Sequence, residues 1–325
     1  MRVLVTGGVG FIGYHLTRAL LARGDSVAVL DDFSNAPYPT VDKRRNAADL
    51  AAEFGAKIVI HEGCITDRAI VTRLVGDTDG IVHLAGIAGV RPSFEEPARY
   101  ARVNVEGTAT IVEAARAAGI TRVTFASSSS VYGNSTPLPA TEDAPAVVPE
   151  SPYAASKRGA ELVASAICRR APNLACTALR FFTVYGPRQR PEMAITLFTR
   201  AIVAGEPITM FGDGSMRRDF THVDDIVRGI VAAFDHTATA TAVGFRAYNL
   251  GSGAPIDLAG LIRAIGETVG VTPKVVEAAQ PVGDVDATYA DISRAKSELG
   301  WAPRILLRDG LRTVHDWVRF RGAQA

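Results

Sequence analysis

One tyrosine and one lysine in the stretch SPYAASKRGAE (residues 151–161) have the types and the spacing for acid–base chemistry. Tyr153 and Lys157 are four residues apart, so in a helix their side chains lie on one face. Pro152 suits the first position of such a helix. A phenol is a poor base at neutral pH, but a neighbouring ammonium group favours its ionised form. The pair therefore predicts a tyrosine that acts as a general base.

A second group of residues, TGGVGFIG (residues 6–13), has the pattern of a dinucleotide-binding turn. Gly8, Gly10 and Gly13 satisfy G-x-G-x-x-G, and Gly7, Gly10 and Gly13 also satisfy G-x-x-G-x-x-G. Glycines permit a tight turn and a close approach of the backbone to a pyrophosphate. A strand-like run precedes the turn and a helical pattern follows it, so the helix would direct free N–H groups at the phosphates.

The acidic residues at the end of the next strand indicate which dinucleotide is bound. Asp31 follows Gly13 by 18 residues, where a carboxylate can accept both ribose hydroxyls. Asp31 and Asp32 would repel the 2′-phosphate of NADP, and no arginine directly follows them. We therefore expect NAD. The basic residues further on (43–45) are expected on a solvated face.

The elements that must position these residues form an alternating pattern. Apolar strand-like runs at 3–7, 26–32, 57–63, 80–86, 122–130 and 176–182 alternate with helical patterns, the clearest at 12–23, 97–118 and 152–170. Such alternation predicts an α/β protein with a doubly wound parallel sheet, a Rossmann fold. The catalytic pair would then begin a crossover helix.

The chain changes character after Gly186, where prolines and glycines separate shorter elements. We expect a second, smaller α/β lobe that covers a ligand, although a helix at about 225–234 has the pattern of a return to the first lobe. The expected division is a NAD-binding Rossmann domain at 1–186, with a returning helix at about 219–240, and an interleaved substrate-binding lobe at 187–325.

The composition limits the possible partners. The chain has 325 residues, is 47% hydrophobic and 21% charged, and carries a formal net charge of +1, which does not indicate nucleic acid or membrane as a partner. The first strand candidate begins directly after Met1, which leaves no room for a signal sequence, so a cytoplasmic location is expected. The three cysteines have no C-x-x-C spacing and are expected to be reduced. His83 and His222 lack partners at metal-ligand spacing, so no metal site is expected.

Several of these motifs together carry a family resemblance. The segments TGGVGFIG, HLAG, RVNVEGT with Asn104, SSSSVYG, YAASK and RRDFTHVDD resemble the extended short-chain dehydrogenases that act on nucleotide sugars. The resemblance covers nearly the whole chain. Within that family, RFFTVYGPRQRPEMA (residues 180–194) is most similar to UDP-glucuronate 4-epimerases.

The resemblance implies a 4-epimerase that holds NAD beneath a UDP-sugar and works as a homodimer. Ser128 would bond the 4-hydroxyl of the sugar, Tyr153 would take its proton, and Lys157 would hold the nicotinamide ribose. A 4-keto sugar would turn over in the site and accept hydride on its other face. The expected NAD contacts are Gly7, Gly10, Phe11, Ile12, Gly13, Asp31, Asp32, Asn35, Ile65, Leu84, Ala85, Gly86, Asn104, Tyr153 and Lys157. The expected UDP-sugar contacts are Ser128, Ser129, Thr183, Arg188, Arg190, Arg218 and Asp284.

Sister activities are distinguished by the serine run. Relatives that dehydrate or decarboxylate the oxidised sugar resemble T-D-E or T-S-E before VYG, whereas this chain has Ser128, Ser129 and Ser130. Without those carboxylates the additional acid–base steps lack a group, so epimerisation remains. Arg188 and Arg190 are two apart in an expected extended stretch, which predicts that they face the same way, and Arg190 matches the carboxylate-binding arginine of the glucuronate enzymes.

Three alternative functions stay open at this point. They are epimerisation of a neutral UDP-hexose, decarboxylation of UDP-glucuronate, and a regulator that binds NAD without turnover. Two departures from the family pattern also affect the contacts. Cys64 stands where many relatives have the aspartate that holds the adenine amine, and a second phosphate-binding arginine expected near Pro281 is absent.

Overall fold

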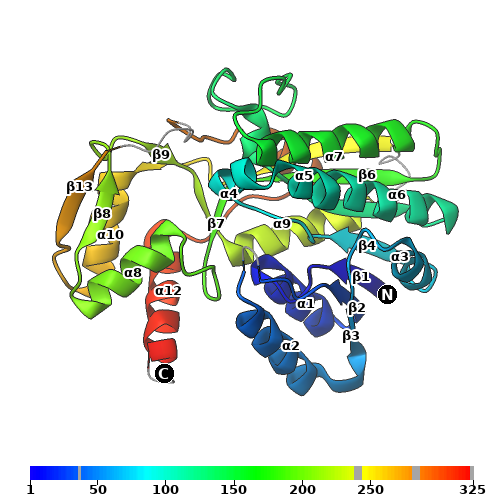
Figure 1. Cartoon of the computed structure of the whole chain (residues 1–325), viewed down its shortest axis with the longest axis horizontal. Helices are drawn as coiled ribbons and strands as arrows, with labels where there is room; N and C mark the ends of the chain where they lie inside the picture. The colour runs from blue at the N-terminus through cyan, green and yellow to red at the C-terminus, as the bar shows by residue number, and fades with distance from the viewer. Residues whose placement is uncertain (36–37, 238–243, 280–285, 323–325) are drawn as a thin grey trace.

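The computed structural model describes residues 1–35, 38–237, 244–279 and 286–322, which form two lobes (Figure 1). The first lobe is built on a seven-stranded sheet with the order β11-β6-β5-β4-β1-β2-β3, and every pair in it is parallel. Its strands are β1 (Arg2–Thr6), β2 (Ser26–Asp31), β3 (Ile58–Glu62), β4 (Gly80–His83), β5 (Arg122–Ser128), β6 (Ala175–Phe181) and β11 (Gly244–Leu250).

Helices cover both faces of this sheet, as the long apolar strands require. One face packs against α1 (Phe11–Arg23), α2 (Thr40–Phe54) and α9 (Val223–His236). The other packs against α3 (Arg68–Val75), α6 (Gly107–Ala117) and α7 (Pro152–Cys168). Figure 1 shows α6 and α7 above the sheet and α1 and α9 below it. The doubly wound fold expected from the sequence is confirmed.

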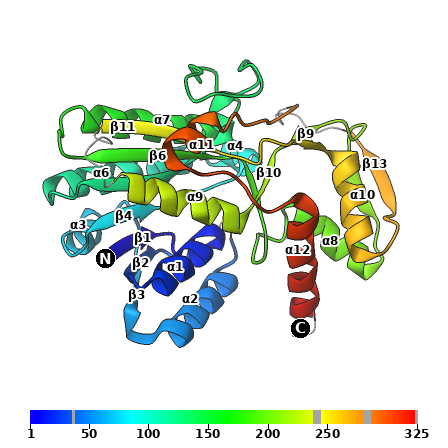
Figure 2. The same cartoon turned by 180° about the vertical axis from the view of Figure 1, so that it is seen from behind.

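The six predicted strands are all present, and β11 is a seventh that the pattern did not reveal. β11 pairs in parallel with β6 along its whole length, from Gly244 opposite Ala175 to Leu250 opposite Phe181. The chain therefore returns to the first lobe three times, with α9, with β11 and, after further elements of the second lobe, with α11 (Ser293–Leu299), as Figure 2 shows from behind. The predicted returning helix is only the first of these elements.

The helix expected at 97–118 is interrupted in its hydrogen-bonding pattern. After α4 (Val90–Glu95), the chain forms α5 (Pro97–Tyr100), a π-helical segment (Ala101–Glu106) and then α6. The π-helical segment adds residues to a turn, and such segments are frequent at functional sites. It directs Asn104, which is only 2% exposed, into the first lobe. Two 3₁₀ turns complete this lobe, at Gly55–Lys57 and Ser129–Tyr132.

The second lobe has short strand pairs packed on three helices around its own apolar core. The strand pairs are β7 (Thr183–Tyr185) with β10 (Phe220–His222), β8 (Ile208–Phe211) with β13 (Val275–Ala278), and β9 (Arg217–Arg218) with β12 (Ile256–Asp257). Its helices are α8 (Ala194–Ala204), α10 (Leu258–Val269) and α12 (Leu307–Gly322). None of the helices in the described residues has the length and apolar character needed to span a membrane.

Candidate active site

A large cavity of about 1070 Å³ opens at the carboxyl ends of the parallel strands and extends between the two lobes. In an open α/β sheet this edge binds ligands where the strand order reverses, which is here between β1 and β4. The volume is slightly above the roughly 300–1,000 Å³ of an ordinary small-molecule pocket. Its walls come from the glycine-rich turn, the ends of β2 to β6, the start of α7, and β7 and β8.

The glycine-rich turn forms one end of the cavity and leaves no room for side chains. Gly7 has a φ of +70°, and a Cβ on it would lie 2.7 Å from the backbone N of Ala85. A Cβ on Gly13 would lie 2.0 Å from the carbonyl oxygen of Gly7. Helix α1 begins at Phe11 with no side-chain cap, so its first N–H groups face the cavity. This bare backbone cradle fits the pyrophosphate of a dinucleotide.

Asp31 and Asp32, at the end of β2, lie against Lys43, which the sequence pattern places on a solvated face. That assignment is wrong for Lys43, which is only 8% exposed. Its Nζ lies 3.0 Å from Asp31 Oδ1 and 3.6 Å from Asp32 Oδ1. On α2 the buried side chains are Lys43, Asn46 and Leu50, a helical spacing that could have revealed the inward face of this helix.

Lys157 lines the cavity from the second turn of α7. Ser151 caps that helix through a 3.2 Å bond from the N–H of Ala154, and Pro152 begins it as predicted. The Nζ of Lys157 donates to the carbonyl oxygen of Ala126 at 3.0 Å. Burial lowers the pKa of Lys157 to about 8, and the nearby Glu161 opposes this by favouring the charged form.

Tyr153 faces the same part of the cavity as Lys157 and Ser128. Burial raises the pKa of Tyr153, while a hydrogen bond with Ser128 and the charge of Arg190 both act to lower it. Ser128 Oγ also bonds to Ser130 Oγ at 3.1 Å and accepts from the Ser130 N–H at 3.2 Å. Tyr153 and Lys157 therefore lie together as their spacing predicted, and Ser128, which the family resemblance indicated, lines the same cavity.

Two residues behind this surface hold the cavity wall without lining it. Asn104 accepts from the N–H of Ile87 at 2.8 Å and donates to its carbonyl oxygen at 3.0 Å, and it also donates to Ser156 Oγ at 2.9 Å. His83 contacts Thr6 and Thr108 through its two ring nitrogens. Burial, together with the charge of Lys157, lowers the pKa of His83 to about 3, so this side chain is a neutral part of the core.

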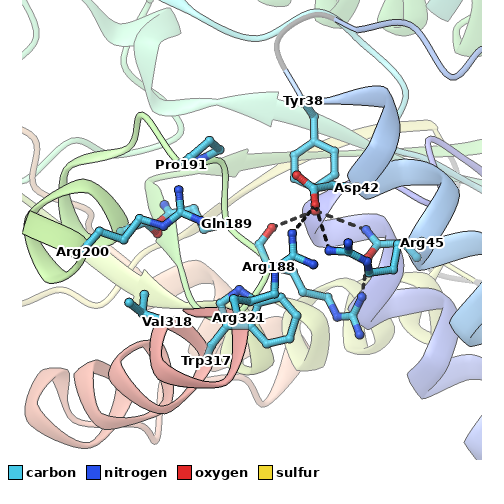
Figure 3. A pocket seen from close by; sticks show the side chains of 12 residues that line it. Tyr38, Asp42, Arg45, Arg188, Gln189, Pro191, Arg200, Trp317, Val318 and Arg321 are labelled. Atoms are coloured by element: carbon cyan, nitrogen blue, oxygen red, sulfur yellow. Dashed lines mark hydrogen bonds and ion pairs between the residues drawn. The ribbon is translucent and has the colours of Figure 1, made fainter. Parts of the chain in front are cut away.

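The two arginines of the segment 186–193 do not point the same way, which corrects the sequence expectation. Arg190 lines the large cavity, where its guanidinium also meets Glu192 Oε1 at 3.2 Å and Met193 Sδ at 3.3 Å. Arg188 instead lines a separate cavity of about 30 Å³ (Figure 3). Its φ of +67° breaks the alternation of an extended strand, and its side chain turns toward α2.

Two further expected contacts do not line the cavity, and a third lies outside the described residues. Asn35 does not line it, because its side chain accepts from the N–H of Thr40 at the start of α2. Asn104 lies behind Gly86 rather than beside a ligand. Asp284 lies outside the described residues. The remaining expected contacts that line the cavity are Gly7, Gly10, Phe11, Ile12, Gly13, Asp31, Asp32, Ile65, Leu84, Ala85, Gly86, Ser128, Ser129, Tyr153, Lys157, Thr183, Arg190 and Arg218.

The cavity wall also contains residues that no sequence motif indicated. Arg91, at the start of α4 on the first lobe, lies with its guanidinium 5.8 Å from the ring centre of Phe211 on β8. Both line the cavity with Arg218, whose Nη1 donates to the carbonyl oxygens of Arg217 and Asp286. Cationic and aromatic groups from both lobes therefore meet in one part of the cavity wall. This part suits a nucleoside diphosphate.

Comparison with known proteins agrees with this geometry. Residues 3–251 match the NAD dependent epimerase/dehydratase family. UDP-glucuronate 4-epimerase 3 of Arabidopsis thaliana is 38% identical over 330 residues, covering 97% of this chain and 76% of the plant protein. UDP-glucuronate 4-epimerase of Thermodesulfobacterium geofontis is 36% identical over 319 residues, covering 97% of this chain and 95% of that protein.

Solved structures extend the likeness to the whole fold. The structure of UDP-glucuronic acid 4-epimerase from Bacillus cereus, in complex with UDP-glucuronic acid and NAD, superimposes with a TM-score of 0.90 at 32% identity. The match covers 99% of this chain and 100% of that one. The cavity, the glycine-rich turn and the relatives lead to one conclusion: this chain belongs to the NAD dependent epimerase/dehydratase family.

Proposed function

We propose that this protein is a UDP-glucuronate 4-epimerase, which inverts carbon 4 of UDP-glucuronate to give UDP-galacturonate. The observation that carries the proposal is the position of Arg190. This arginine lines the same cavity as Tyr153, and its charge acts on the pKa of that phenol. An arginine beside the catalytic pair supplies a planar, two-point partner for the carboxylate of a sugar acid. The named relatives support the same substrate.

NAD fits one end of the cavity, where Gly7, Gly10 and Gly13 would hold its pyrophosphate and Asp31 its adenosine ribose. When bound, NAD supplies the hydride acceptor and donor for carbon 4 of the sugar. Lys157 would hold the nicotinamide ribose, and its ammonium would favour the phenolate of Tyr153. The described part of the chain provides this end of the cavity without any side chain that would fill it.

The protein's own groups then move one proton. Ser128 bonds the 4-hydroxyl and orients it toward Tyr153, and Tyr153 takes its proton as carbon 4 is oxidised. The same proton returns when carbon 4 is reduced on its opposite face, so no net oxidation occurs. Arg218 and Arg91 would hold the diphosphate while the sugar turns over, with Thr183 and Ser129 beside the sugar.

Arg190 would have a second task. The 4-keto sugar acid is a β-keto acid, which loses carbon dioxide when the bond between carbon 5 and its carboxylate lies parallel to the π orbitals of the 4-keto group. A carboxylate gripped by Arg190 is held away from that geometry. Replacing Arg190 with alanine should therefore weaken the binding of the acid and release some decarboxylated pentose product. If neither change occurs, this role of Arg190 is wrong.

The experiment that tests the proposed function needs no added cofactor. Purified protein is incubated separately with UDP-glucuronate and with UDP-glucose, and the sugar is followed by proton NMR. Conversion of the acid alone to UDP-galacturonate supports the proposal. Conversion of the neutral sugar alone would mean a UDP-hexose epimerase, and a pentose product would mean a decarboxylase. No conversion even with NAD supplied would favour a regulator.

We also propose that the protein is a cytoplasmic homodimer. The three cysteines are free thiols, which supports a reducing compartment. Leu162 on α7 is 53% exposed, and a helix that presents a large apolar side chain to solvent can pack against a second copy of itself. Light scattering would give the mass in solution, and Leu162→Lys should shift it toward the monomer.

A further inference from the structure

The segment 186–193 between β7 and α8 carries two arginines that face different cavities, and the reason lies in how the segment is anchored. Arg190 faces the sugar end of the large cavity. Arg188, two residues earlier, faces α2 and is only 14% exposed at its side chain. Its backbone has the left-handed φ of +67°, which residues other than glycine seldom adopt without compensation.

The guanidinium of Arg188 makes contacts that compensate for this backbone conformation. It donates to Asn46 Oδ1 and, at 2.7 Å, to Asp49 Oδ2, both on α2. It also stacks between two rings, 3.9 Å from the centre of Tyr14 and 4.9 Å from that of Trp317. In Figure 3, Arg188 lies between Trp317 of α12 and the side chains of α2. The arginine therefore connects the second lobe to α1 and α2 of the first.

The backbone of the same segment is fixed to the first lobe as well. Tyr38 Oη donates to the carbonyl oxygen of Arg188 at 3.0 Å. His15 Nε2 bonds the carbonyl oxygen of Pro187 at 2.9 Å. Thus the peptide units before Arg190 are attached to residues of the lobe that carries the glycine-rich turn. Nothing in these contacts involves the sugar.

One of these partners reaches the glycine-rich turn directly. Asn46 Nδ2 donates to the carbonyl oxygen of Val9, inside TGGVGFIG, at 2.9 Å, and to Tyr38 Oη at 3.2 Å. Lys43, one turn earlier on α2, contacts Asp31. The helix that holds Arg188 is therefore the helix that contacts both the phosphate end and the ribose end of the dinucleotide site.

We propose that Arg188 is a positioning residue: by anchoring the segment 186–193 to α2, it fixes Arg190 toward the carboxylate of the substrate. The proposal rests on the proposed function, because it assigns Arg190 to a sugar acid. Removing the anchor should weaken recognition of the acid group while leaving recognition of the nucleotide unchanged. A residue needed only for folding would weaken both.

The test measures binding rather than turnover, in a Tyr153→Phe background that holds substrate without converting it. Dissociation constants for UDP-glucuronate, UDP-glucose and UDP are obtained by calorimetry. Arg188→Gly is the main variant, because glycine accepts a φ of +67° and removes only the side chain. We expect it to weaken the binding of UDP-glucuronate about 10-fold to 30-fold, which corresponds to the loss of one charge-assisted contact. The binding of UDP should weaken less than about two-fold.

Three comparison variants make the result specific. Arg190→Ala should weaken UDP-glucuronate to a similar extent, and the double variant Arg188→Gly with Arg190→Ala should lose little more than either alone. Asp49→Asn, which changes only the partner of Arg188, should give a smaller loss of the same kind. Arg200→Ala removes an exposed arginine at the other side of the small cavity and should leave all three constants within two-fold.

The outcomes distinguish an Arg188 that positions Arg190 from an Arg188 that is needed only for folding. If Arg188→Gly weakens UDP and UDP-glucuronate equally, or if the losses from Arg188→Gly and Arg190→Ala multiply, Arg188 does not act through Arg190 and the inference is overturned. The same holds if Arg190→Ala is damaging but Arg188→Gly is harmless. If Arg190→Ala itself has no effect on the preference for the acid, acid recognition by Arg190 fails and the inference falls with it.

Discussion

Arg180 of β6 and Glu161 of α7 form a buried two-point ion pair. Arg180 Nε lies 2.9 Å from Glu161 Oε1, and its Nη2 lies 2.9 Å from Oε2. Ser127 Oγ donates to the same Oε1 at 2.6 Å. Burial would raise the pKa of Glu161, but the bonds and charge of Arg180 outweigh it and hold that pKa below its usual range. The pair therefore connects β6 and the end of β5, next to Ser128, to the helix α7 that carries Tyr153.

Breaking this pair on one side should cost more than removing it entirely. Glu161→Gln leaves the buried Arg180 uncompensated, and Arg180→Met leaves the buried Glu161 with only Arg158 and Ser127 as partners. Each is expected to lower the free energy of unfolding by ~3–5 kcal/mol. The double variant Arg180→Met with Glu161→Leu should recover more than half of that loss, because both fully buried charges are gone and Arg158, the other partner of Glu161, has a side chain that is 25% exposed. Urea unfolding followed by circular dichroism measures all three. Equal, additive losses would contradict the expectation.

Lys157 should lower the free energy of unfolding at neutral pH, although it is needed for activity. Its pKa falls to about 8 in the fold from the ordinary 10.5, so between these pH values the unfolded chain binds more protons. The contribution of Lys157 to the free energy of unfolding is therefore highest above about pH 10.5, where its side chain is neutral, and this part of the stability is lost as the pH falls through about 8. At pH 7, Lys157→Met should raise the free energy of unfolding by ~1–3 kcal/mol, while epimerisation falls at least about 100-fold.

A matched lysine distinguishes this effect from a general loss of charge. Lys296 on α11 is exposed, so Lys296→Met should change neither stability nor activity. Unfolding curves for the parent and both variants at pH 7 and at pH 10.5 provide the measurement. The gain from Lys157→Met should shrink at the higher pH. A gain that stays the same at both pH values would mean that packing, rather than the buried charge, is its source.

The sheet could be predicted where apolar runs are continuous, and it could not where polar side chains interrupt them. Six strands have such runs because helices bury both of their faces. β11 contains Arg246, Tyr248 and Asn249 within seven residues. Asn249 is fully buried and accepts from Tyr132 Oη at 2.6 Å. That partner is far away in the sequence, so no local pattern indicates that the polar residue belongs to a core strand.

The candidate site shows the same limit. The tyrosine–lysine pair and the glycine-rich turn depend on local geometry, and both lie where their spacing predicted. Arg188 and Arg190 were expected to face one way because side chains alternate along an extended chain. The left-handed backbone of Arg188 breaks that rule, and only its contacts with the distant helix α2 make such a backbone acceptable. Lys43 was misassigned because its partner Asp31 lies on another element.

Replacing Lys43 should weaken the retention of NAD. Its Nζ lies 3.0 Å from Asp31 Oδ1, in a buried position, and neutralises that carboxylate. Asp31 is expected to accept the ribose hydroxyls of NAD. Lys43→Met keeps much of the side-chain volume and removes the charge, and we expect about a 3-fold to 10-fold loss of NAD affinity, by the usual worth of one charge-assisted bond. Lys57→Met, at an exposed lysine, is the control. NAD released from the purified proteins by acid and quantified by chromatography gives the answer, and equal NAD content in both variants would contradict it.

Asn104 should be as important for the cavity wall as a ligand contact, although it does not line the cavity and lies behind Gly86 and Ile87, which do. Asn104→Ala leaves the N–H and carbonyl of Ile87 without their partner, so it should lower the free energy of unfolding by ~2–4 kcal/mol. Asn104→Asp keeps the acceptor for the Ile87 N–H and should lose less, and Ser156→Ala, which removes one bond, should lose least. Turnover should fall in the same order with little change in KM, because Ile87 and Lys157 line the cavity from either side of this asparagine. Urea unfolding and steady-state kinetics on the three variants test the order. If Asn104→Ala is as stable as Ser156→Ala, the π-helical segment does not depend on the bonds between Asn104 and Ile87.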